Sequence, residues 1–407
     1  MREERRKVTA IARHGRLRKR NPVGAIFKLL AGTLSVLLIS TVAVGAVALS
    51  QVEGTIEAVE LENEVAGAPP PDIGSFDGGF NILVVGSDEC EFSDGCNGRG
   101  SARLNDVTML VHVSQDQTNI TAVSFPRDLV VPIPSCPSED GKGHYASMSA
   151  QPINVTLSYG GLACTVKPVE ALTGLAIPYA GLITFGGVVQ MSNAVGGVTV
   201  CVNGPVIDRK ANGINLPKAG EYTISGWKAL GFLRTRYGVG DGSDLGRISN
   251  QQVYLSSLVR KVKSEDVLTN PAALFSLATT AARNMQLSTY LKNVNTMVSM
   301  ANVLRKIDLE QVKFVQYPST TGVGGVYSGK VAPIQRKADE LFSLIRADKP
   351  FTLTAGNTGR GSVLNPAAPV EPVAPGTETE APPVESTQLS GVHGQSAADY
   401  TCSKANN

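Results

Sequence analysis

One uncharged run near the N-terminus constrains this chain most, because it separates a short basic segment from all that follows. The 24 residues from Leu29 to Val52 include no charged side chain and are mainly apolar. A helix of that length can cross a hydrocarbon core of roughly 30 Å. The sequence predicts a basic cytoplasmic segment over 1–28, a single transmembrane helix over 29–52 and an extracellular remainder, since basic flanks stay cytoplasmic. A cleaved signal peptide is the alternative, because small residues occur at 46–50.

The cysteines agree with an extracellular location. All six follow the apolar run: Cys90, Cys96, Cys136, Cys164, Cys201 and Cys402. An even number of cysteines outside a membrane indicates disulfide bonds. Cys90 and Cys96 enclose a short polar loop and form the preferred pair, while the other four allow three pairings that the sequence leaves open. Zinc binding is disfavoured, because the chain has no C-x-x-C motif and its histidines lack ligand spacing.

The charge balance argues against nucleic-acid binding. The chain has 37 Lys and Arg against 35 Asp and Glu, and nine of the basic residues lie within 1–20. The predicted extracellular part is therefore mildly acidic and has no broad basic stripe. Its local basic clusters suit a small anionic group better than a nucleic acid.

Hydrophobic periodicity predicts an α/β fold. Strand-like runs occur at 80–86, 107–113, 119–125, 196–202 and 313–317, and helical patterns at 165–176, 180–194, 225–233, 248–263, 271–283, 290–306 and 334–346. Ser225 is the candidate N-cap of the helix that starts there. Strands interleaved with helices indicate a layered domain. We expect a stalk over 53–77, one domain over 78–350 and a disordered Pro/Thr/Ala-rich tail over 351–407.

Four arginines form a candidate phosphate site. Arg127 lies in P-R-D just after a strand, Arg234 and Arg236 lie in R-T-R, and Arg247 follows in D-L-G-R-I-S-N-Q-Q. In an extended chain both arginines of R-T-R point to one face. Guanidinium groups bind phosphate oxygens in pairs and stay charged at biological pH. The alternative for Arg127 is a solvated or salt-bridged surface residue, and for R-T-R it is ion pairing with Asp241, Asp244 or other acids.

The spacing of Asp244, Arg247 and Gln251 adds to this cluster. The three residues are separated by three and four positions, so a helix would place them on one face. An intrahelical salt bridge with a neighbouring amide is the simpler alternative. Together with R-T-R, the pattern favours a surface that faces phosphate.

Two aspartates at strand ends form a candidate metal site. Asp88 follows the strand that ends in V-V-G-S-D, and Asp106 begins the next strand. Mg²⁺ is bound by one or two carboxylates together with substrate phosphates. The alternative is that both aspartates act as turn or cap residues.

The stretch 172–191 is nearly free of charge. Most stretches of this kind belong to a hydrophobic core. The functional alternative is a groove for an acyl or prenyl chain, lined by Tyr179 and Phe185.

These motifs resemble those of the LytR-CpsA-Psr family over roughly 80–263. In the family's order, the chain contains V-V-G-S-D, R-L-N-D-V-T-M-L, S-F-P-R-D, I-N-V-T-L-S-Y-G-G, N-A-V-G-G-V, G-W-K-A-L, R-T-R and D-L-G-R-I-S-N-Q-Q. The resemblance implies an α/β/α layered sandwich with a central mixed sheet, anchored by one transmembrane helix. It also implies a Mg²⁺-dependent transferase that moves a glycopolymer from a polyprenyl phosphate or pyrophosphate carrier to peptidoglycan, forming a phosphodiester.

The resemblance also assigns roles to residues. Asp88 and Asp106 would hold the metal ion, and Asp244 would orient the arginines or accept a proton from the attacking hydroxyl. The pyrophosphate would be bound by Arg103, Arg127, Arg234, Arg236, Arg247 and Gln251.

Two departures from the family pattern leave other functions open. Arg103 precedes its aspartate by R-x-x-D where the family usually has R-x-D, and Pro152 stands where members often have lysine, with Lys142 as a possible replacement. The alternatives are a polyprenyl-pyrophosphate pyrophosphatase and a non-catalytic lipid-binding scaffold or regulator of the envelope.

Overall fold

The computed structural model describes 58–62, 78–89, 103–139, 142–264, 267–268, 270–365 and 386–406, together with residues 33 and 54. All but residue 33 belong to one compact unit, Val52–Asn407. Apart from residue 33, the predicted transmembrane helix lies outside the described residues, as does the predicted Cys90–Cys96 pair. Among the residues described, no helix is long and apolar enough to cross a membrane.

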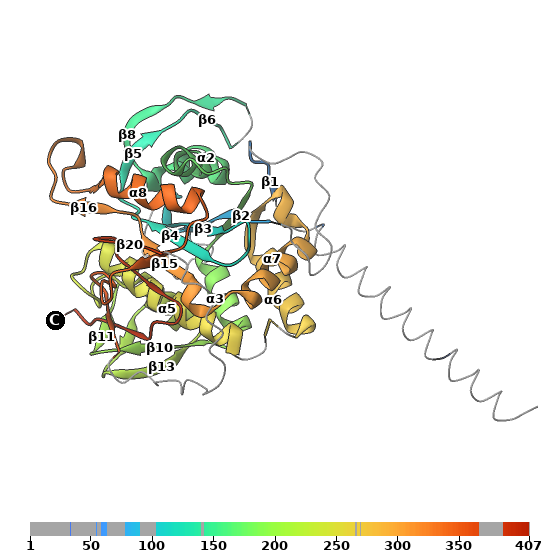
Figure 1. The fold of residues 1–407 in the computed structure, drawn as a ribbon, viewed down its shortest axis with the longest axis vertical. Helices are drawn as coiled ribbons and strands as arrows, with labels where there is room; N and C mark the ends of the chain where they lie inside the picture. The colour runs from blue at the N-terminus through green and yellow to red at the C-terminus, as the bar shows by residue number, and fades with distance from the viewer. Residues whose placement is uncertain are drawn as a thin grey trace, which may run out of the picture. The chain divides into compact units, whose positions relative to one another are not determined.

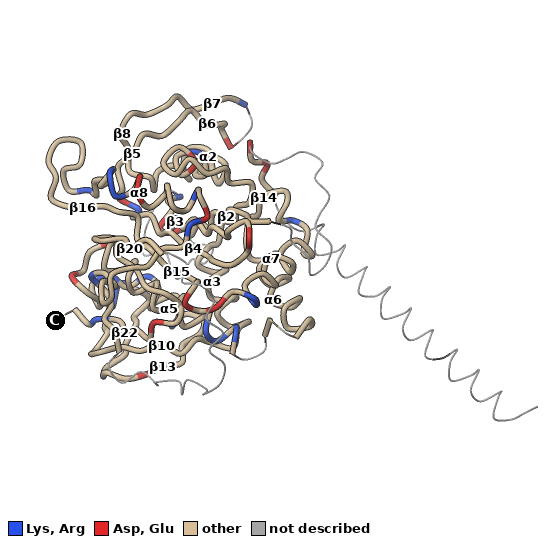
Figure 2. The backbone as a smooth tube through the Cα atoms, in the orientation of Figure 1, with Lys and Arg blue, Asp and Glu red and all other residues tan. Residues whose placement is uncertain are grey.

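One eight-stranded mixed sheet forms the centre of this unit (Figure 1). Its strands, in spatial order, are β1 (Ala58–Val59), β14 (Met285–Ser288), β9 (Tyr179–Ile183), β2 (Phe80–Ser87), β3 (Asn105–Val113), β4 (Ile120–Phe125), β15 (Val312–Gln316) and β21 (Gly394–Ser396). Within β2, β3, β4 and β15 the charged residues are Asp106 and Lys313. Figure 2 marks the charged positions along the described part of the trace. The apolar runs predicted as strands at 80–86, 107–113, 119–125 and 313–317 are confirmed.

Strand directions bring several chain segments to one end of the sheet. β2 is parallel to β9 and antiparallel to β3, β3 is antiparallel to β4, and β4 is parallel to β15. The carboxyl ends of β2, β9, β4 and β15 therefore lie beside the amino end of β3. This end of the sheet positions the candidate site.

Helices cover both faces of the sheet, as Figure 1 shows. One face carries α2 (Thr156–Thr173) and α8 (Gln335–Arg346), and the other carries α3 (Phe185–Ala194), α5 (Asp244–Ser264), α6 (Pro271–Asn284) and α7 (Val294–Lys306). The prediction of an α/β fold with a central mixed sheet is confirmed. A helix, α4 (Gly226–Arg234), precedes α5.

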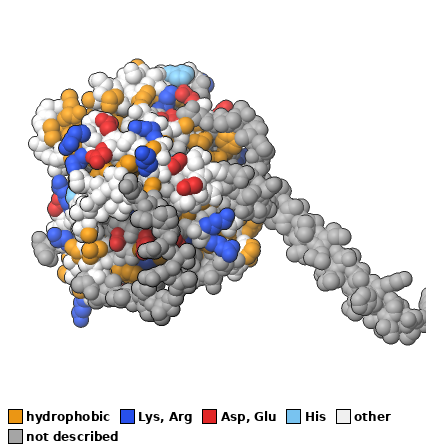
Figure 3. Space-filling view, in the orientation of Figure 1, with side chains coloured by type: hydrophobic (Ala, Val, Ile, Leu, Met, Phe, Trp, Pro, Cys, Tyr) orange, Lys and Arg blue, Asp and Glu red, His pale blue; other side chains and the backbone are white. Residues whose placement is uncertain are grey.

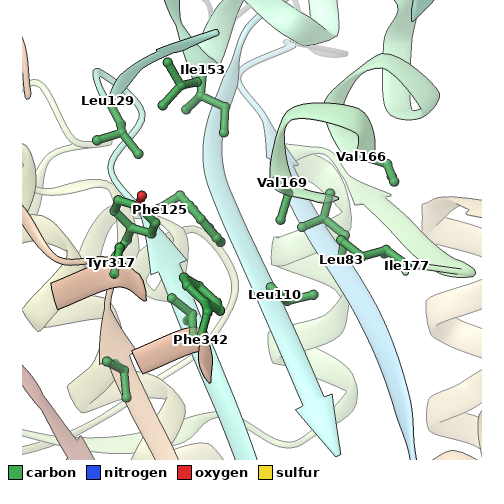
Figure 4. Packing of buried hydrophobic residues seen from close by; sticks show 14 of the residues in the cluster. Leu83, Leu110, Phe125, Leu129, Ile153, Val166, Val169, Ile177, Tyr317 and Phe342 are labelled. Carbon is green, nitrogen blue, oxygen red and sulfur yellow. The ribbon is translucent and has the colours of Figure 1, made fainter. Parts of the chain in front are cut away.

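The main core lies between the sheet, α2 and α8. Phe125 of β4, Tyr317 just after β15 and Phe342 of α8 pack together, with ring centroids 5.1 to 6.4 Å apart (Figure 4). Burial raises the pKa of Tyr317 to about 12. Burying aromatic side chains of this size is a main source of folding free energy.

A second, four-stranded sheet lies against α5. Its order is β13 (Gly220–Ile224), β10 (Val198–Val202), β22 (Thr401–Ser403) and β19 (Ser362–Leu364). The remaining strands form pairs: β5 (Val130–Ile133) with β8 (Met148–Pro152), β6 (Cys136–Pro137) with β7 (His144–Tyr145), β11 (Val206–Asp208) with β12 (Ile214–Leu216), β16 (Ser319–Thr321) with β17 (Val331–Pro333), and β18 (Phe351–Leu353) with β20 (Thr387–Leu389).

The expectation of a disordered tail is wrong for its described parts. β18, β19 and the three strands after residue 386 all pair with other strands, and β21 extends the central sheet. Ser403 donates to Asn250 Oδ1 (2.5 Å), and Gln395 donates to Ser256 Oγ (2.7 Å). The C-terminal segment thereby holds α5. The stalk also differs from the prediction, because Leu61 is buried in the main core and β1 pairs with β14.

Two disulfide bonds resolve the pairing that the sequence leaves open. Cys136 is bonded to Cys164, which ties the β6–β7 pair to α2. Cys201 is bonded to Cys402, which fixes β22 beside β10 across 201 positions of sequence. These bonds limit the conformations of the unfolded chain, most strongly for the longer loop.

Several predicted element boundaries are wrong. The apolar run 180–194 is not one helix: β9 occupies its beginning and α3 the rest. Helix α5 begins at Asp244, four residues earlier than predicted, and α7 begins at Val294 after a short 3-10 turn. Ser225 is the N-cap of α4 by position, but its side chain makes no capping hydrogen bond.

Candidate functional site

A cleft of 320 Å³ opens at the end of the sheet where the strands converge. It is lined by Asp106, Arg127, Asp208, Lys210, Ala211, Arg234, Arg236, Tyr237 and Arg247. Five of these side chains are basic and two are acidic. On the face shown in Figure 3, acidic and basic side chains are interspersed.

A β-bulge directs Asp106 into the cleft. Ser87 pairs with Asn105 and Gly86 pairs with Val107, so Asp106 is an extra residue of β3. Such bulges re-aim side chains beside functional sites. The Asp106 carboxylate lies 2.5 Å from Arg127 Nη1 and 3.6 Å from Arg247 Nη1.

These arginines keep Asp106 ionised. Burial raises the pKa of the carboxyl, but the nearby Arg247 and Arg127 outweigh that effect and lower it below 3.8. For Arg127, burial alone would lower the pKa, but the neighbouring Asp106 outweighs burial, and the pKa of Arg127 is raised. The cleft floor is therefore a charged network.

Asp244 positions two of the arginines from the first turn of α5. Its carboxylate is 4 % exposed, accepts a hydrogen bond from the Arg127 backbone N–H (3.1 Å) and lies 2.6 Å from Arg247 Nη2. Arg247 also donates to the backbone oxygen of Asp106 (2.8 Å). The predicted helical spacing of Asp244 and Arg247 is confirmed, and their salt bridge forms part of the site.

Gln251 follows on the same helix but does not line the cleft. Its amide donates to the backbone oxygen of Leu233 at the end of α4 (3.0 Å). It therefore fixes the start of the R-T-R segment, which is an indirect contribution to the cleft.

The R-T-R segment is held by a carboxylate that sequence reasoning missed. Asp208, at the end of β11, is 5 % exposed and accepts hydrogen bonds from Thr235 Oγ1 (2.9 Å) and from the backbone N–H groups of Arg236 and Tyr237 (both 3.2 Å). Because Asp208 binds the backbone, it leaves the guanidinium groups of R-T-R to face the cleft. The sequence signal for this residue is the acid in D-R-K (208–210), just before two basic residues.

Both arginines of R-T-R line the cleft, as predicted. Arg234 donates to Asn212 Oδ1 (2.5 Å), and its guanidinium lies 4.0 Å from the ring centroid of Phe185. The Nε atom of Arg236 is buried and has no hydrogen-bond partner among the described residues. Phe185 thus lies beside the cleft.

The two predicted metal ligands lie on neighbouring strand ends. Asp88 Oδ1 accepts a hydrogen bond from the Leu104 backbone N–H (2.8 Å), which places it beside β3 two residues before Asp106. Asp88 does not line the cleft. In the described part of the chain, no group of three or more His, Cys, Asp or Glu side chains could hold a metal ion. Two aspartates fit Mg²⁺ only if substrate phosphates complete its ligands.

Arg103 lies in a different cavity. It pairs with Glu89 (3.0 Å) and Glu139 (2.5 Å), in a cavity of 470 Å³ at the ends of β2 and β9. The prediction that Arg103 joins the other arginines is therefore wrong, because two carboxylates already neutralise it.

Tyr179 is also far from the cleft. It begins β9, whereas Phe185 follows the other end of that strand. Tyr179 packs edge-on against Phe80 and Tyr290, so the two residues do not line one groove. Pro152 ends β8, and Lys142 does not line the cleft.

A model of the LytR_cpsA_psr family matches residues 48–342. The chain belongs to this family. The LytR-CpsA-Psr match spans the central sheet from β1 to β15 and every residue of the cleft.

Individual relatives agree with the family match. The chain is 30% identical to the cell wall biosynthesis protein LcpA of Corynebacterium glutamicum over 76% of this chain and 63% of LcpA. It is 26% identical to the polyisoprenyl-teichoic acid–peptidoglycan teichoic acid transferase TagT of Bacillus subtilis, over 83% of this chain and 98% of TagT. The chain thus spans less than two thirds of LcpA.

Solved structures share the fold. Protein gbs0355 of Streptococcus agalactiae aligns with a TM-score of 0.52 at 20% identity, covering 67% of this chain and 88% of that one. TagV of B. subtilis aligns with a TM-score of 0.50 at 21% identity, covering 67% and 98%. At these identities the likeness concerns the LytR-CpsA-Psr fold alone.

Proposed function

We propose that this protein transfers a glycopolymer from a polyprenyl phosphate or pyrophosphate carrier to peptidoglycan and forms a phosphodiester bond. The observation that carries the proposal is the cleft in which Arg127, Arg234, Arg236 and Arg247 converge with two acids between them. The match to TagT covers 98% of the length of TagT, and TagT is named as a teichoic acid transferase. That name supports the same reaction class.

The geometry suits phosphoryl transfer. Such reactions depend on positioning and on neutralising the charge of the transferred group more than on covalent help from the protein. In a pyrophosphate donor, an acceptor hydroxyl would attack the sugar-bearing phosphorus, and the bond to the bridging oxygen would break. Polyprenyl phosphate would leave and take up the proton of the acceptor hydroxyl, and the arginines would stabilise its charge.

Asp244 acts as a positioning residue in this scheme. Its carboxylate already binds the Arg127 backbone and the Arg247 guanidinium. Both contacts fix cations on the cleft floor, and they leave the carboxylate buried. We therefore assign Asp244 to the orientation of the arginines instead of proton transfer.

Asp106 and Asp88 would hold Mg²⁺ together with the donor phosphates. When bound, this ion would neutralise part of the phosphate charge. The ionised state of Asp106, which its two arginines maintain, supports the role of Asp106. The role of Asp88, which lies on the neighbouring strand end outside the lining of the cleft, is what the family resemblance implies.

The carrier lipid and the predicted anchor would place the reaction at the outer face of the membrane. The apolar run 29–52 would fix the domain there, with the N-terminus cytoplasmic. Phe185, beside Arg234, would contact the start of the prenyl chain where it leaves the phosphate.

The test is transfer by the full-length protein in detergent, with a polyprenyl pyrophosphate sugar, Mg²⁺ and purified peptidoglycan. The proposal predicts wall-linked sugar, lost in Asp106→Ala and Arg236→Ala. Free sugar phosphate in the presence of peptidoglycan would instead indicate a pyrophosphatase. Lipid binding without turnover would indicate a scaffold.

A further inference from the structure

The cleft has a buried floor and an exposed rim of different chemistry. Arg247 and Asp106 form the floor, with side chains 4 % and 10 % exposed. Tyr237 and Lys210 form the rim, and Tyr237 is 60 % exposed. A large aromatic side chain is therefore open to water at the edge of a charged cleft.

One buried carboxylate builds this rim. Asp208 Oδ1 accepts from the Lys210 backbone N–H (2.9 Å), and Asp208 Oδ2 accepts from the Tyr237 backbone N–H (3.2 Å). The β11–β12 turn and the end of R-T-R are thereby fixed to each other. The relative position of the Lys210 and Tyr237 backbones does not depend on a flexible loop.

The two rim side chains also contact each other. The ammonium of Lys210 lies 4.7 Å from the Tyr237 ring centroid, within the range of a cation–π interaction. Lys210 has no carboxylate partner within ion-pairing distance among the described residues. Its charge is therefore available at the mouth of the cleft, beside the exposed ring of Tyr237.

We propose that Lys210 and Tyr237 form a saccharide subsite that binds the sugar next to the donor phosphate. The proposal rests on the proposed function, which places the phosphates on the arginine floor. A sugar attached to a phosphate on the floor would emerge at the rim. There the Tyr237 ring packs against the apolar face of the sugar, and Lys210 donates hydrogen bonds to its oxygens.

The experiment compares the binding of two lipids to the full-length protein. One is a short-chain prenyl pyrophosphate, and the other is the same lipid carrying one N-acetylglucosamine. Tyr237→Ala should weaken binding of the sugar-bearing lipid about tenfold, a change of about 1.4 kcal/mol, and leave the sugar-free lipid within about twofold. Tyr237→Phe, which keeps the ring, should retain most of the affinity. Lys210→Met should show the same selective loss.

The chain offers a matched control outside the cleft. Lys228 lies 5.8 Å from the Tyr222 ring centroid, and neither residue lines the cleft. Tyr222→Ala and Lys228→Met should leave the affinity for both lipids unchanged.

Each remaining outcome decides between the two proposals. Equal losses for both lipids, or no loss for either, would overturn the saccharide subsite while wild-type binding upholds the phosphate floor. Failure of the wild-type protein to bind either lipid would overturn both. Selective loss without any transfer to peptidoglycan would uphold the subsite and refute the transferase.

Discussion

Two polar cavities at the same end of the central sheet differ in their charge balance. The cleft has five basic and two acidic lining side chains, and the cavity around Arg103 has two of each. In the second cavity, Glu89 and Glu139 pair with Arg103 directly. In the cleft, Asp208 is used by backbone N–H groups, and Asp106 is shared by Arg127 and Arg247.

The comparison shows why arginine motifs alone do not define a phosphate site. A guanidinium paired with two carboxylates has little positive charge left for a ligand. Arg127 and Arg247 are also each paired with two carboxylates, but the cleft keeps an excess of basic side chains because Asp208, one of its two lining acids, binds the backbone. This distribution of acids distinguishes a binding cleft from a structural ion-pair cluster.

The largest effect should come from removing the most buried cation. Arg247→Ala leaves the buried Asp244 without a guanidinium partner and removes one of the two partners of Asp106, so the free energy of unfolding should fall by about 3–5 kcal/mol. In Arg103→Ala, the partners Glu89 and Glu139 are about half exposed, and the loss should be about 0–1 kcal/mol. Urea unfolding of both variants measures the difference, and equal losses would contradict the contrast.

The next effect concerns activity without stability. Arg236 has no carboxylate partner in the described part of the chain, so Arg236→Ala should keep the wild-type melting temperature. Transfer should fall about 100- to 1000-fold, the range for losing one donor to the reacting group. Arg283→Ala, in the second cavity, is the control and should transfer at the wild-type rate. An equal loss of transfer activity in Arg236→Ala and Arg283→Ala would show that the two cavities do not differ in function.

A smaller effect should follow from removing the carboxylate that holds R-T-R. Asp208→Ala leaves buried N–H groups unpaired, which costs about 1–3 kcal/mol. The amides of Arg236 and Tyr237 should then exchange with solvent faster than in the wild-type protein. Asp241→Ala is the matched control, since its partner Arg360 is 41 % exposed. Unchanged amide exchange in Asp208→Ala would show that the R-T-R segment keeps its conformation without the Asp208 carboxylate.

The smallest effect is a pH dependence. The Asp106 pKa is lowered on folding, so its ionised form contributes stability that is complete above 3.8 and is lost as the pH falls through the folded-state value. The gap in unfolding free energy between the wild type and Asp106→Asn should therefore narrow only below pH 3.8. A gap that stays constant with pH would mean that packing, and not charge, makes Asp106 important.

Sequence reasoning found the floor of the cleft because its residues lie in charged motifs. Arg127, Arg234, Arg236 and Arg247 combine residue type with helical or extended spacing that brings them to one surface. Asp208 was missed because its partners in and after R-T-R, the Thr235 hydroxyl and the backbone N–H groups of Arg236 and Tyr237, lie 27 to 29 positions away, and the D-R-K motif gives no indication of these contacts. The position of Arg103 was predicted wrongly because Glu139 reaches it from a distant part of the chain.

The fold was predictable where strands and helices are long and periodic. The 180–194 run was misassigned because a short apolar segment fits a buried strand and a helix equally well. The C-terminal segment was misassigned because its average composition resembles a disordered tail. Its short strands are stabilised by pairing with β10 and β15 and by the Cys201–Cys402 bond, all of which depend on residues far away in sequence.

The central claim is that the excess of basic side chains in the cleft binds phosphate groups. The most direct test is a calorimetric titration of the full-length protein with a short-chain prenyl pyrophosphate. We expect binding to the wild-type protein, at least about tenfold weaker binding to Arg236→Ala, and unchanged binding to Arg103→Ala; tenfold corresponds to about 1.4 kcal/mol. Strong binding to Arg236→Ala together with lost binding to Arg103→Ala would place the phosphate site in the second cavity and contradict the account.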